Sequence, residues 1–301
     1  MIRDSDITVV VSGKIIHEDS PKGYSTKNVL KSIRRNLPNA AIIISTWDNE
    51  DIEGLNPDLL IQSIDPGPLP DLSKNNSHNR QIVSVHNGLS KVETPYVIKM
   101  RTDTIIRETL FLDYFGRYDH NNLEYKIFNH RIITLTHFSR NPRNSGLLYH
   151  PSDIFHFGYT NDVRNFWNAN LLKSDSLNFY SDSNLAQEQY FWKNCIERNT
   201  PLKITPTDFS IFNIINSELF FVNNFIPLSP LQSGIQIPER FMKAPVNLNY
   251  SYEKWKVLYQ DYCVNKSSFR KLEIAFSAGI VKKMRMYLGN KKRKLLKYES
   301  R

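Results

Sequence analysis

The segment YVIKMRTD, residues 96–103, ends in side chains that could bind a phosphorylated ligand. An apolar strand pattern leads to Arg101, and Asp103 lies two positions later, so both side chains point the same way on an extended chain. A carboxylate here could bind a divalent cation on a nucleotide diphosphate, because Mg²⁺ takes one or two carboxylates together with phosphate oxygens. Arg101 could bind phosphate directly and replace part of that cation's role. The alternative is a structural Arg–Asp pair that closes the end of the sheet.

Polar residues also follow three other apolar runs. Gly13 ends ITVVVSG, Trp47 and Asp48 follow AAIIIST, and Asp65 ends DLLIQSID. Ligands of an open α/β sheet bind beyond the carboxyl ends of its strands. One aspartate alone is more often a turn or helix cap, but several on one rim favour a polar-ligand site. Trp47 could stack on a nucleobase, or it could pack under a loop.

The helix expected before residues 96–103 begins near Asn79 and Arg80. Backbone amides and the positive end of the helix dipole at such a start suit phosphate, and Arg80 adds a full charge. The alternative is that Asn79 is an ordinary cap and Arg80 is solvated.

Two carboxylates are candidates for a general base. Glu188 lies at the start of the helical segment AQEQYFW, after a polar loop at residues 172–184. It could deprotonate an acceptor hydroxyl, or it could be a first-turn glutamate favoured by the helix dipole. Asp153 lies among His150, His156 and aromatic residues. The two histidines lack the spacing of zinc ligands, which favours packing or acceptor contacts for them.

The elements that must position these residues alternate in type. Apolar runs alternate with helical patterns in the first half, which predicts an α/β, Rossmann-like domain with a mostly parallel central sheet. The expected strands are residues 7–13, 40–46, 58–65, 96–103, 131–138 and 153–159, and the expected helices are 26–37, 80–92 and 186–198. Residues 201–245 show no assignable pattern. We expect a main domain at 1–248 and a basic, amphipathic helical segment at 249–301.

The net charge of +9 is concentrated in the tail. Residues 266–301 hold twelve lysines and arginines against two glutamates, a local charge of +10, so residues 1–265 together carry −1. A basic tail with apolar residues predicts docking on an anionic membrane surface. A nucleic-acid partner is not expected, because that class usually carries its positive charge along a groove of the body.

Several absences in the sequence set the expected location. It has no apolar run of about 18 residues that could span a bilayer. The aspartates near the N-terminus interrupt any signal-peptide pattern. Cys195 and Cys263 are expected to be free thiols in a reducing compartment. These features predict a cytoplasmic protein that is peripheral on the inner membrane.

DITVVVSGKIIHE, TKNVLKSIRRNLPNAAIIISTW, NRQIVSVHNGLSKVETPYVIKMRTD, HPSDIFHFG and EQYFW together resemble the WavE-type lipopolysaccharide-synthesis family. The resemblance runs through about residues 5–195. That family is similar to GT-A glycosyltransferases, whose nucleotide-sugar site follows the fourth strand. The resemblance implies that Asp103 is the one acid left where those enzymes carry an Asp-x-Asp motif, which puts strict dependence on Mn²⁺ or Mg²⁺ in doubt. It also implies that Glu188 lies near the catalytic-base position of inverting members. The late histidine of GT-A sites is missing or replaced, because His156 is the last histidine.

The resemblance implies a glycosyltransferase that moves a sugar from a nucleotide-sugar donor to a lipopolysaccharide or capsular polysaccharide acceptor, saccharide or lipid-linked. Two alternatives remain open. A sugar nucleotidyltransferase would use a similar sheet, but the segment SGKIIHEDSPKG is poor in glycine for its nucleotide loop. A non-catalytic, membrane-docking component of polysaccharide assembly would need no base.

Overall fold

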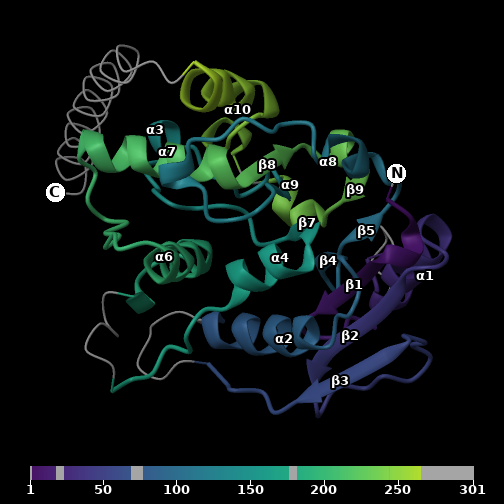
Figure 1. Ribbon diagram of the computed structural model, residues 1–301. Helices are drawn as coiled ribbons and strands as arrows, with labels where there is room; N and C mark the ends of the chain where they lie inside the picture. The colour runs from purple at the N-terminus through teal and green to yellow at the C-terminus, as the bar shows by residue number, and fades with distance from the viewer. Residues whose placement is uncertain (1, 18–23, 69–76, 176–181, 244, 266–301) are drawn as a thin grey trace, which may run out of the picture.

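The computed structural model of the 301-residue chain describes residues 2–17, 24–68, 77–175, 182–243 and 245–265 (Figure 1). In this part of the chain a seven-stranded sheet has the order β3-β2-β1-β4-β7-β6-β8. Its strands are β1 (Ile7–Ser12), β2 (Ala41–Trp47), β3 (Leu59–Ser63), β4 (Tyr96–Arg101), β6 (Ile132–Leu135), β7 (Phe155–Tyr159) and β8 (Phe225–Leu228).

Of these seven strands, only β7 is antiparallel to its neighbours. The pairs β1–β2, β1–β4, β2–β3 and β6–β8 are parallel, whereas β7 is antiparallel to both β4 and β6. The expected α/β architecture with a mostly parallel sheet is therefore confirmed. One edge of the sheet, the carboxyl edge, gathers the ends of six strands and the beginning of β7.

The helices α1 (Thr26–Asn36) and α2 (His78–Ser90) follow β1 and β3 and lie on opposite faces of the sheet (Figure 1). This follows from right-handed crossovers that run outward from β1 to β2 and back from β3 to β4. The α2 helix lies very close to β1. A Cβ atom on Gly88 would come within 2.5 Å of Val10 Cγ1, so glycine allows this contact.

The expected start of α2 was wrong by two residues. The helix begins at His78 with Ser77 as N-cap. Asn79 does not cap it; its side chain accepts a hydrogen bond from the backbone N–H of Leu172 (2.8 Å) and donates one to the carbonyl of the same residue (2.9 Å). Asn79 therefore joins α2 to the chain that follows helix α4 (Thr160–Trp167).

The second half of the chain adds helices around β6, β7 and β8. The α4 helix packs against α2, α6 and β7, and α10 packs against α7 and β8. The segment 201–245 had no predicted structure; its described residues contain α7, β8 and several short elements. The bounds are α3 (Pro142–Ser145), α4 (Thr160–Trp167), α6 (Gln187–Asn199), α7 (Ile211–Asn224), α8 (Pro230–Ser233), α9 (Glu239–Met242) and α10 (Tyr252–Tyr259).

A small second sheet joins two distant segments. Its strands are β5 (Ile105–Ile106) and β9 (Ile235–Gln236), which pair antiparallel. Short 3₁₀ helices occur at Asp4–Asp6, Leu110–Tyr114, Leu123–Tyr125 and Val246–Leu248, and a π-helical turn at Gln260–Val264 ends the described chain.

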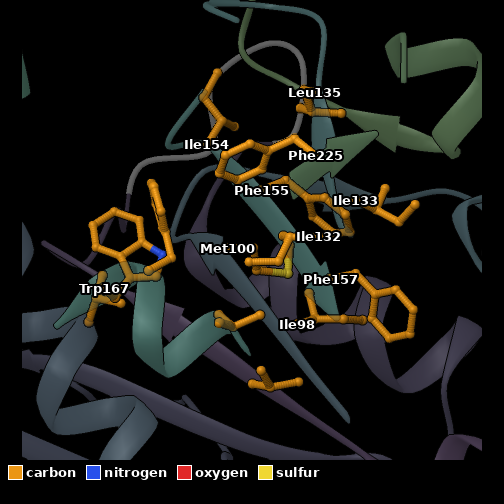
Figure 2. Packing of buried hydrophobic residues seen from close by; sticks show 14 of the residues in the cluster. Ile98, Met100, Ile132, Ile133, Leu135, Ile154, Phe155, Phe157, Trp167 and Phe225 are labelled. Atoms are coloured by element: carbon orange, nitrogen blue, oxygen red, sulfur yellow. The ribbon is translucent and has the colours of Figure 1, made fainter. Parts of the chain in front are cut away.

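The hydrophobic core is continuous across the sheet. Ile98 and Met100 of β4 are cross-strand neighbours of Phe157 and Phe155 of β7, and all four side chains are buried. Figure 2 shows these four residues together with side chains from β6 and β8. Phe111 packs edge-on or tilted against both phenylalanines of β7, with ring centroids 5.1–5.2 Å apart. This packing fixes β7 beside β4 and so fixes what lies at the carboxyl edge.

Part of the sequence interpretation lies outside the described residues. Residues 266–301, which hold the charge of the basic tail, and residues 176–181 of the polar loop are among those left out. Within the described ranges no helix is long and apolar enough to cross a bilayer.

Candidate functional site

A cavity of about 860 Å³ opens at the carboxyl edge of the sheet. It lies beyond the ends of β1, β2 and β4, and the start of α2 and the α9 segment complete its wall. Six of the seven predicted ligand-binding residues line it, namely Gly13, Trp47, Asp65, Arg80, Arg101 and Asp103. The sheet therefore brings together residues that are up to 90 positions apart in the sequence.

Asp48 is the predicted residue that does not line the cavity. Its backbone N–H donates to the Ser63 carbonyl (2.9 Å), and its side chain is exposed. Trp47 lines the cavity but is only 5% exposed. Gly13 has a φ of +117°, a backbone conformation that residues other than glycine rarely adopt. It turns the chain away from β1 at the cavity wall.

Asp65 and Arg80 form a bidentate ion pair on one side of the cavity. Arg80 Nε donates to Asp65 Oδ1 at 2.8 Å, and Arg80 Nη2 donates to Asp65 Oδ2 at 2.7 Å. These hydrogen bonds lower the pKa of the Asp65 carboxyl. The pair joins the segment after β3 to the first turn of α2, where the positive end of a helix lies next to the cavity.

Asp103 lies between two arginines on the other side. Arg101 Nε donates to Asp103 Oδ1 at 3.0 Å, and Arg240 Nη2 donates to Asp103 Oδ2. The Asp103 side chain is 1% exposed, whereas those of Arg101 and Arg240 are 30% and 58% exposed. Phe241 lies beneath both guanidinium groups, whose central carbons are 5.0 Å and 4.7 Å from its ring centroid. Two cations thus face the cavity while a buried carboxylate and an aromatic ring hold them.

The small sheet explains how Arg240 reaches Asp103. Strand β5 begins two residues after Asp103, and its Ile105 pairs with Gln236 of β9, four residues before Arg240. The Gly234 carbonyl accepts hydrogen bonds from the next two backbone N–H groups after β5, at 2.8 Å and 3.2 Å. No sequence pattern predicted this contact, because each strand has only two residues.

The carboxylates of the cavity wall do not fit a divalent cation. Such a cation needs several oxygen ligands that are not otherwise bound. Both oxygens of Asp65 and of Asp103 are already paired with arginines, and Glu50 Oε2 accepts the Ile15 backbone N–H at 3.1 Å. The described ranges contain no group of three His, Cys, Asp or Glu side chains that could hold a metal ion.

Lys99 is a buried cation at the inner wall of the cavity, and the sequence analysis missed it. It lies in β4, and its ammonium group donates to the Asp153 backbone carbonyl and lies 4.3 Å from the Trp167 ring centroid. Burial lowers the pKa of Lys99 to about 8. The signal for it was present, since a lysine interrupts an otherwise apolar strand in YVIKMR.

Glu188 and Asp153, the two predicted bases, lie beside the cavity and not in its wall. Glu188 is in the first turn of α6, where its neighbour Gln187 hydrogen-bonds to Ser77 and Gln81 of the cavity wall. Burial, together with the negative charge of Asp153, raises the pKa of Glu188 to about 8. The Glu188 side chain is still 15% exposed. A carboxyl group with a pKa near neutrality and some access to solvent suits proton transfer.

His150 lies against Glu188, a relationship that the sequence did not predict. Its Nδ1 is 2.9 Å from the Phe138 carbonyl, which can only accept, so Nδ1 carries the proton of the neutral ring. Its Nε2 is then an acceptor, 3.6 Å from Glu188 Oε2. Burial and the charge of Arg140 lower the pKa of His150 to about 4, so the ring is neutral beside the glutamate.

The backbone around this pair is strained. Phe138 and Tyr149 have φ values of 65° and 52°, which residues with a Cβ seldom adopt. Such conformations cluster at functional sites, where the surrounding structure holds them.

His156 has a structural role. Its Nδ1 accepts from Trp167 Nε1 (3.0 Å) and its Nε2 donates to the Ser152 carbonyl (2.7 Å).

Comparison with protein families identifies the family to which this chain is similar. A family model described as WavE lipopolysaccharide synthesis covers residues 7–288. The match extends beyond residue 195, where the resemblance seen in the sequence ended, and includes most of the basic tail. A search among curated proteins finds no match to this chain.

Proposed function

The chain belongs to the WavE lipopolysaccharide-synthesis family, and from this premise we propose that it is a glycosyltransferase. It moves a sugar from a nucleotide-sugar donor to a growing lipopolysaccharide or capsular polysaccharide. The observation that carries the proposal is the position of a buried carboxyl group with a raised pKa, Glu188, beside a large cavity with cationic walls at the carboxyl edge of the sheet.

The cavity suits the nucleotide part of such a donor. Its volume of about 860 Å³ is within the range of small-molecule and cofactor sites. Five cationic side chains line it, namely Lys14, Arg80, Lys99, Arg101 and Arg240, against the three carboxylates of Glu50, Asp65 and Asp103. An excess of positive charge favours phosphate over neutral ligands. Trp47 lies in the wall and is the candidate for contact with the base.

Glu188 is the proposed general base, and Asp153 is the alternative. The acceptor hydroxyl oxygen attacks the anomeric carbon of the donor, and its proton passes to the Glu188 carboxylate. The bond between the anomeric carbon and the phosphate oxygen breaks, and the nucleotide leaves with that electron pair. The Nδ1-protonated His150 presents an acceptor to the glutamate, so it can orient the Glu188 carboxyl group when this is protonated.

Two other functions give different outcomes in the same assays. A sugar nucleotidyltransferase would release pyrophosphate from a nucleoside triphosphate. A non-catalytic, membrane-docking component would neither bind donors tightly nor turn them over. We favour the transferase over the second of these, because a scaffold has no need of a buried carboxyl group with a pKa of about 8.

The acceptor would be a saccharide, and if it is lipid-linked the enzyme works at a membrane surface. We therefore propose that the basic tail, residues 266–301, docks the protein on the anionic inner membrane. The support is its sequence, with a local charge of +10. Docking would raise the local concentration of a lipid-linked acceptor.

A thermal-shift screen tests the proposed donor. The purified protein is melted with UDP, GDP, CMP and dTDP, each with and without Mn²⁺. A nucleotide that binds only the folded state at about 100 times its Kd stabilises it by about 2.7 kcal/mol. We expect one nucleotide to raise Tm by several degrees. A flat response to all four, with normal folding, would leave the transferase proposal without a donor site.

A further inference from the structure

We propose that Arg101 and Arg240 hold the diphosphate of the donor in the place of a divalent cation, and that Asp103 positions these two arginines. This inference rests on the proposed nucleotide-sugar donor. It assigns to Asp103 a role other than metal binding, and it assigns a site residue, Arg240, that no motif of the sequence marked.

The hydrogen bonds of Asp103 are the first support. A carboxylate that binds a metal ion must offer it an oxygen, yet Arg101 binds one oxygen of Asp103 and Arg240 binds the other. Arg101 Nη2 also lies 3.3 Å from Asp103 Oδ2. The Asp103 side chain is 1% exposed, whereas the guanidinium groups that it binds are the exposed part of this wall.

The arginines, in contrast, retain donors for a ligand. A guanidinium group has five N–H donors in a fixed, planar arrangement that matches phosphate oxygens. The hydrogen bonds to Asp103 use two nitrogen atoms of Arg101 and one of Arg240. Both residues line the cavity. Two cations at one wall supply the same formal charge as one divalent ion, and so can stabilise the negative charge that develops on a leaving nucleoside diphosphate.

The position of Arg240 is built into the fold. Pairing of β5 with β9 brings the two chain segments together just beyond Asp103. Gly234 allows the close approach, because a Cβ there would lie 2.3 Å from the Glu108 carbonyl oxygen. Tyr24 secures the other side, since its hydroxyl donates to the Ile237 carbonyl at 2.8 Å. Phe241 then lies against both guanidinium groups. These contacts hold Arg240 before any ligand binds.

Calorimetry distinguishes arginine binding from metal binding. The wild-type protein is titrated with UDP, GDP and dTDP, first in EDTA and then with Mn²⁺. We expect one of these diphosphates to bind with Kd values that agree within about threefold in the two conditions. Binding that appears only with Mn²⁺ would overturn the inference and leave the proposed function intact. No binding of these three in either condition would overturn the inference, and the thermal-shift response to CMP would then decide whether the proposed function stands.

Variants of Arg240, the more exposed of the two arginines, give a second test of the inference. Arg240→Ala should raise the Kd of the nucleoside diphosphate that the wild type binds by roughly 10- to 100-fold. This is the usual effect of losing a charge-assisted hydrogen bond. The affinity of this variant for the parent nucleoside should change less than threefold. A general loss of structure would instead weaken the binding of the nucleoside as well. Arg240→Lys should recover only part of the loss, because lysine cannot bind in a planar, bidentate manner.

Lys243→Ala is the matched control. Lys243 is an exposed cation three residues further along the same segment, and it does not line the cavity. Removing it changes the net charge by the same amount and should leave the Kd of the diphosphate unchanged. Equal weakening in Lys243→Ala and Arg240→Ala would reduce the effect to long-range charge and overturn the assignment. Retention of wild-type affinity in Arg240→Ala would do the same.

Discussion

Arg240 donates a hydrogen bond to Asp103, although 137 positions separate the two residues in the sequence. The contact closes the cavity wall at the end of β4 with a residue from the last third of the chain. It also changes how the end of β4 is interpreted. What looks in the sequence like a remnant of a metal-binding motif is, in the structure, the anchor of a pair of arginines.

Asp103→Asn tests this anchoring role. Asparagine keeps the shape of the side chain but loses the charge that holds Arg101 and Arg240. We expect KM for the donor to rise by roughly 10- to 100-fold, because charge-assisted hydrogen bonds contribute about 1.5–3 kcal/mol, with a smaller change in kcat. Steady-state kinetics measure the two parameters separately. A variant with both KM and kcat unchanged would contradict the anchoring role of Asp103.

Glu188→Gln tests the proposed base. The variant cannot accept a proton, so kcat should fall by roughly 10²–10⁴-fold, the usual contribution of general-base catalysis. The Kd of the nucleotide should not change. The wild-type rate should rise with pH and level off above about 8, where Glu188 is ionised. If Asp153→Asn shows this loss and Glu188→Gln does not, the two roles must be exchanged. If neither variant loses activity, neither carboxylate is the base and the proposed mechanism is contradicted.

The same glutamate should affect stability with a defined sign. Its pKa is raised in the folded protein from 4.5 to about 8, so the folded state retains a proton that the unfolded chain has already lost in this range. Its contribution to stability is therefore full below pH 4.5 and is lost as pH rises through about 8. A glutamine side chain does not titrate in this pH range, so the stability of Glu188→Gln lacks this dependence on pH.

We therefore expect Tm of Glu188→Gln, relative to the wild type, to increase between pH 5 and pH 9. Differential scanning fluorimetry at several pH values measures this without any substrate. A difference in Tm that stays constant over that range would show that Glu188 is not held in a protonated, buried state.

The tail can be tested by truncation after Asn265, the last residue of the described chain. Lysine and arginine near an anionic bilayer contribute about 1 kcal/mol each, so a segment of charge +10 should give binding that salt reverses. In sedimentation with anionic vesicles the full chain should pellet and the truncated protein should stay in the supernatant. Equal partitioning of the two proteins would exclude a membrane role for the tail.

The first half of the fold could be predicted because its sequence repeats a simple local pattern. Each strand from β1 to β4 is an apolar run, and helix signals separate β1 from β2 and β3 from β4, so the order of these elements follows directly. The α7 helix had no such signal. Its residues 217–224 are all buried, which removes helical periodicity, and β8 follows at once with no turn residue between them.

The candidate site divides in the same way. Residues that directly follow a strand, such as Asp65 and Asp103, could be found from strand ends alone. Arg240 could not, because two-residue strands bring it into place. The contact of His150 with Glu188 joins the loop before β7 to the first turn of α6, 38 positions apart, and no local pattern predicts it.

The most direct test of the central claim is donor turnover. The purified protein is incubated with UDP-, GDP-, CMP- and dTDP-sugars, and the release of free nucleotide is measured with and without a lipopolysaccharide acceptor extract. We predict release from one class of donor, stimulated by acceptor and lost in Glu188→Gln. Release of pyrophosphate from a nucleoside triphosphate, or no turnover of any donor by protein that binds its nucleotide, would contradict the account.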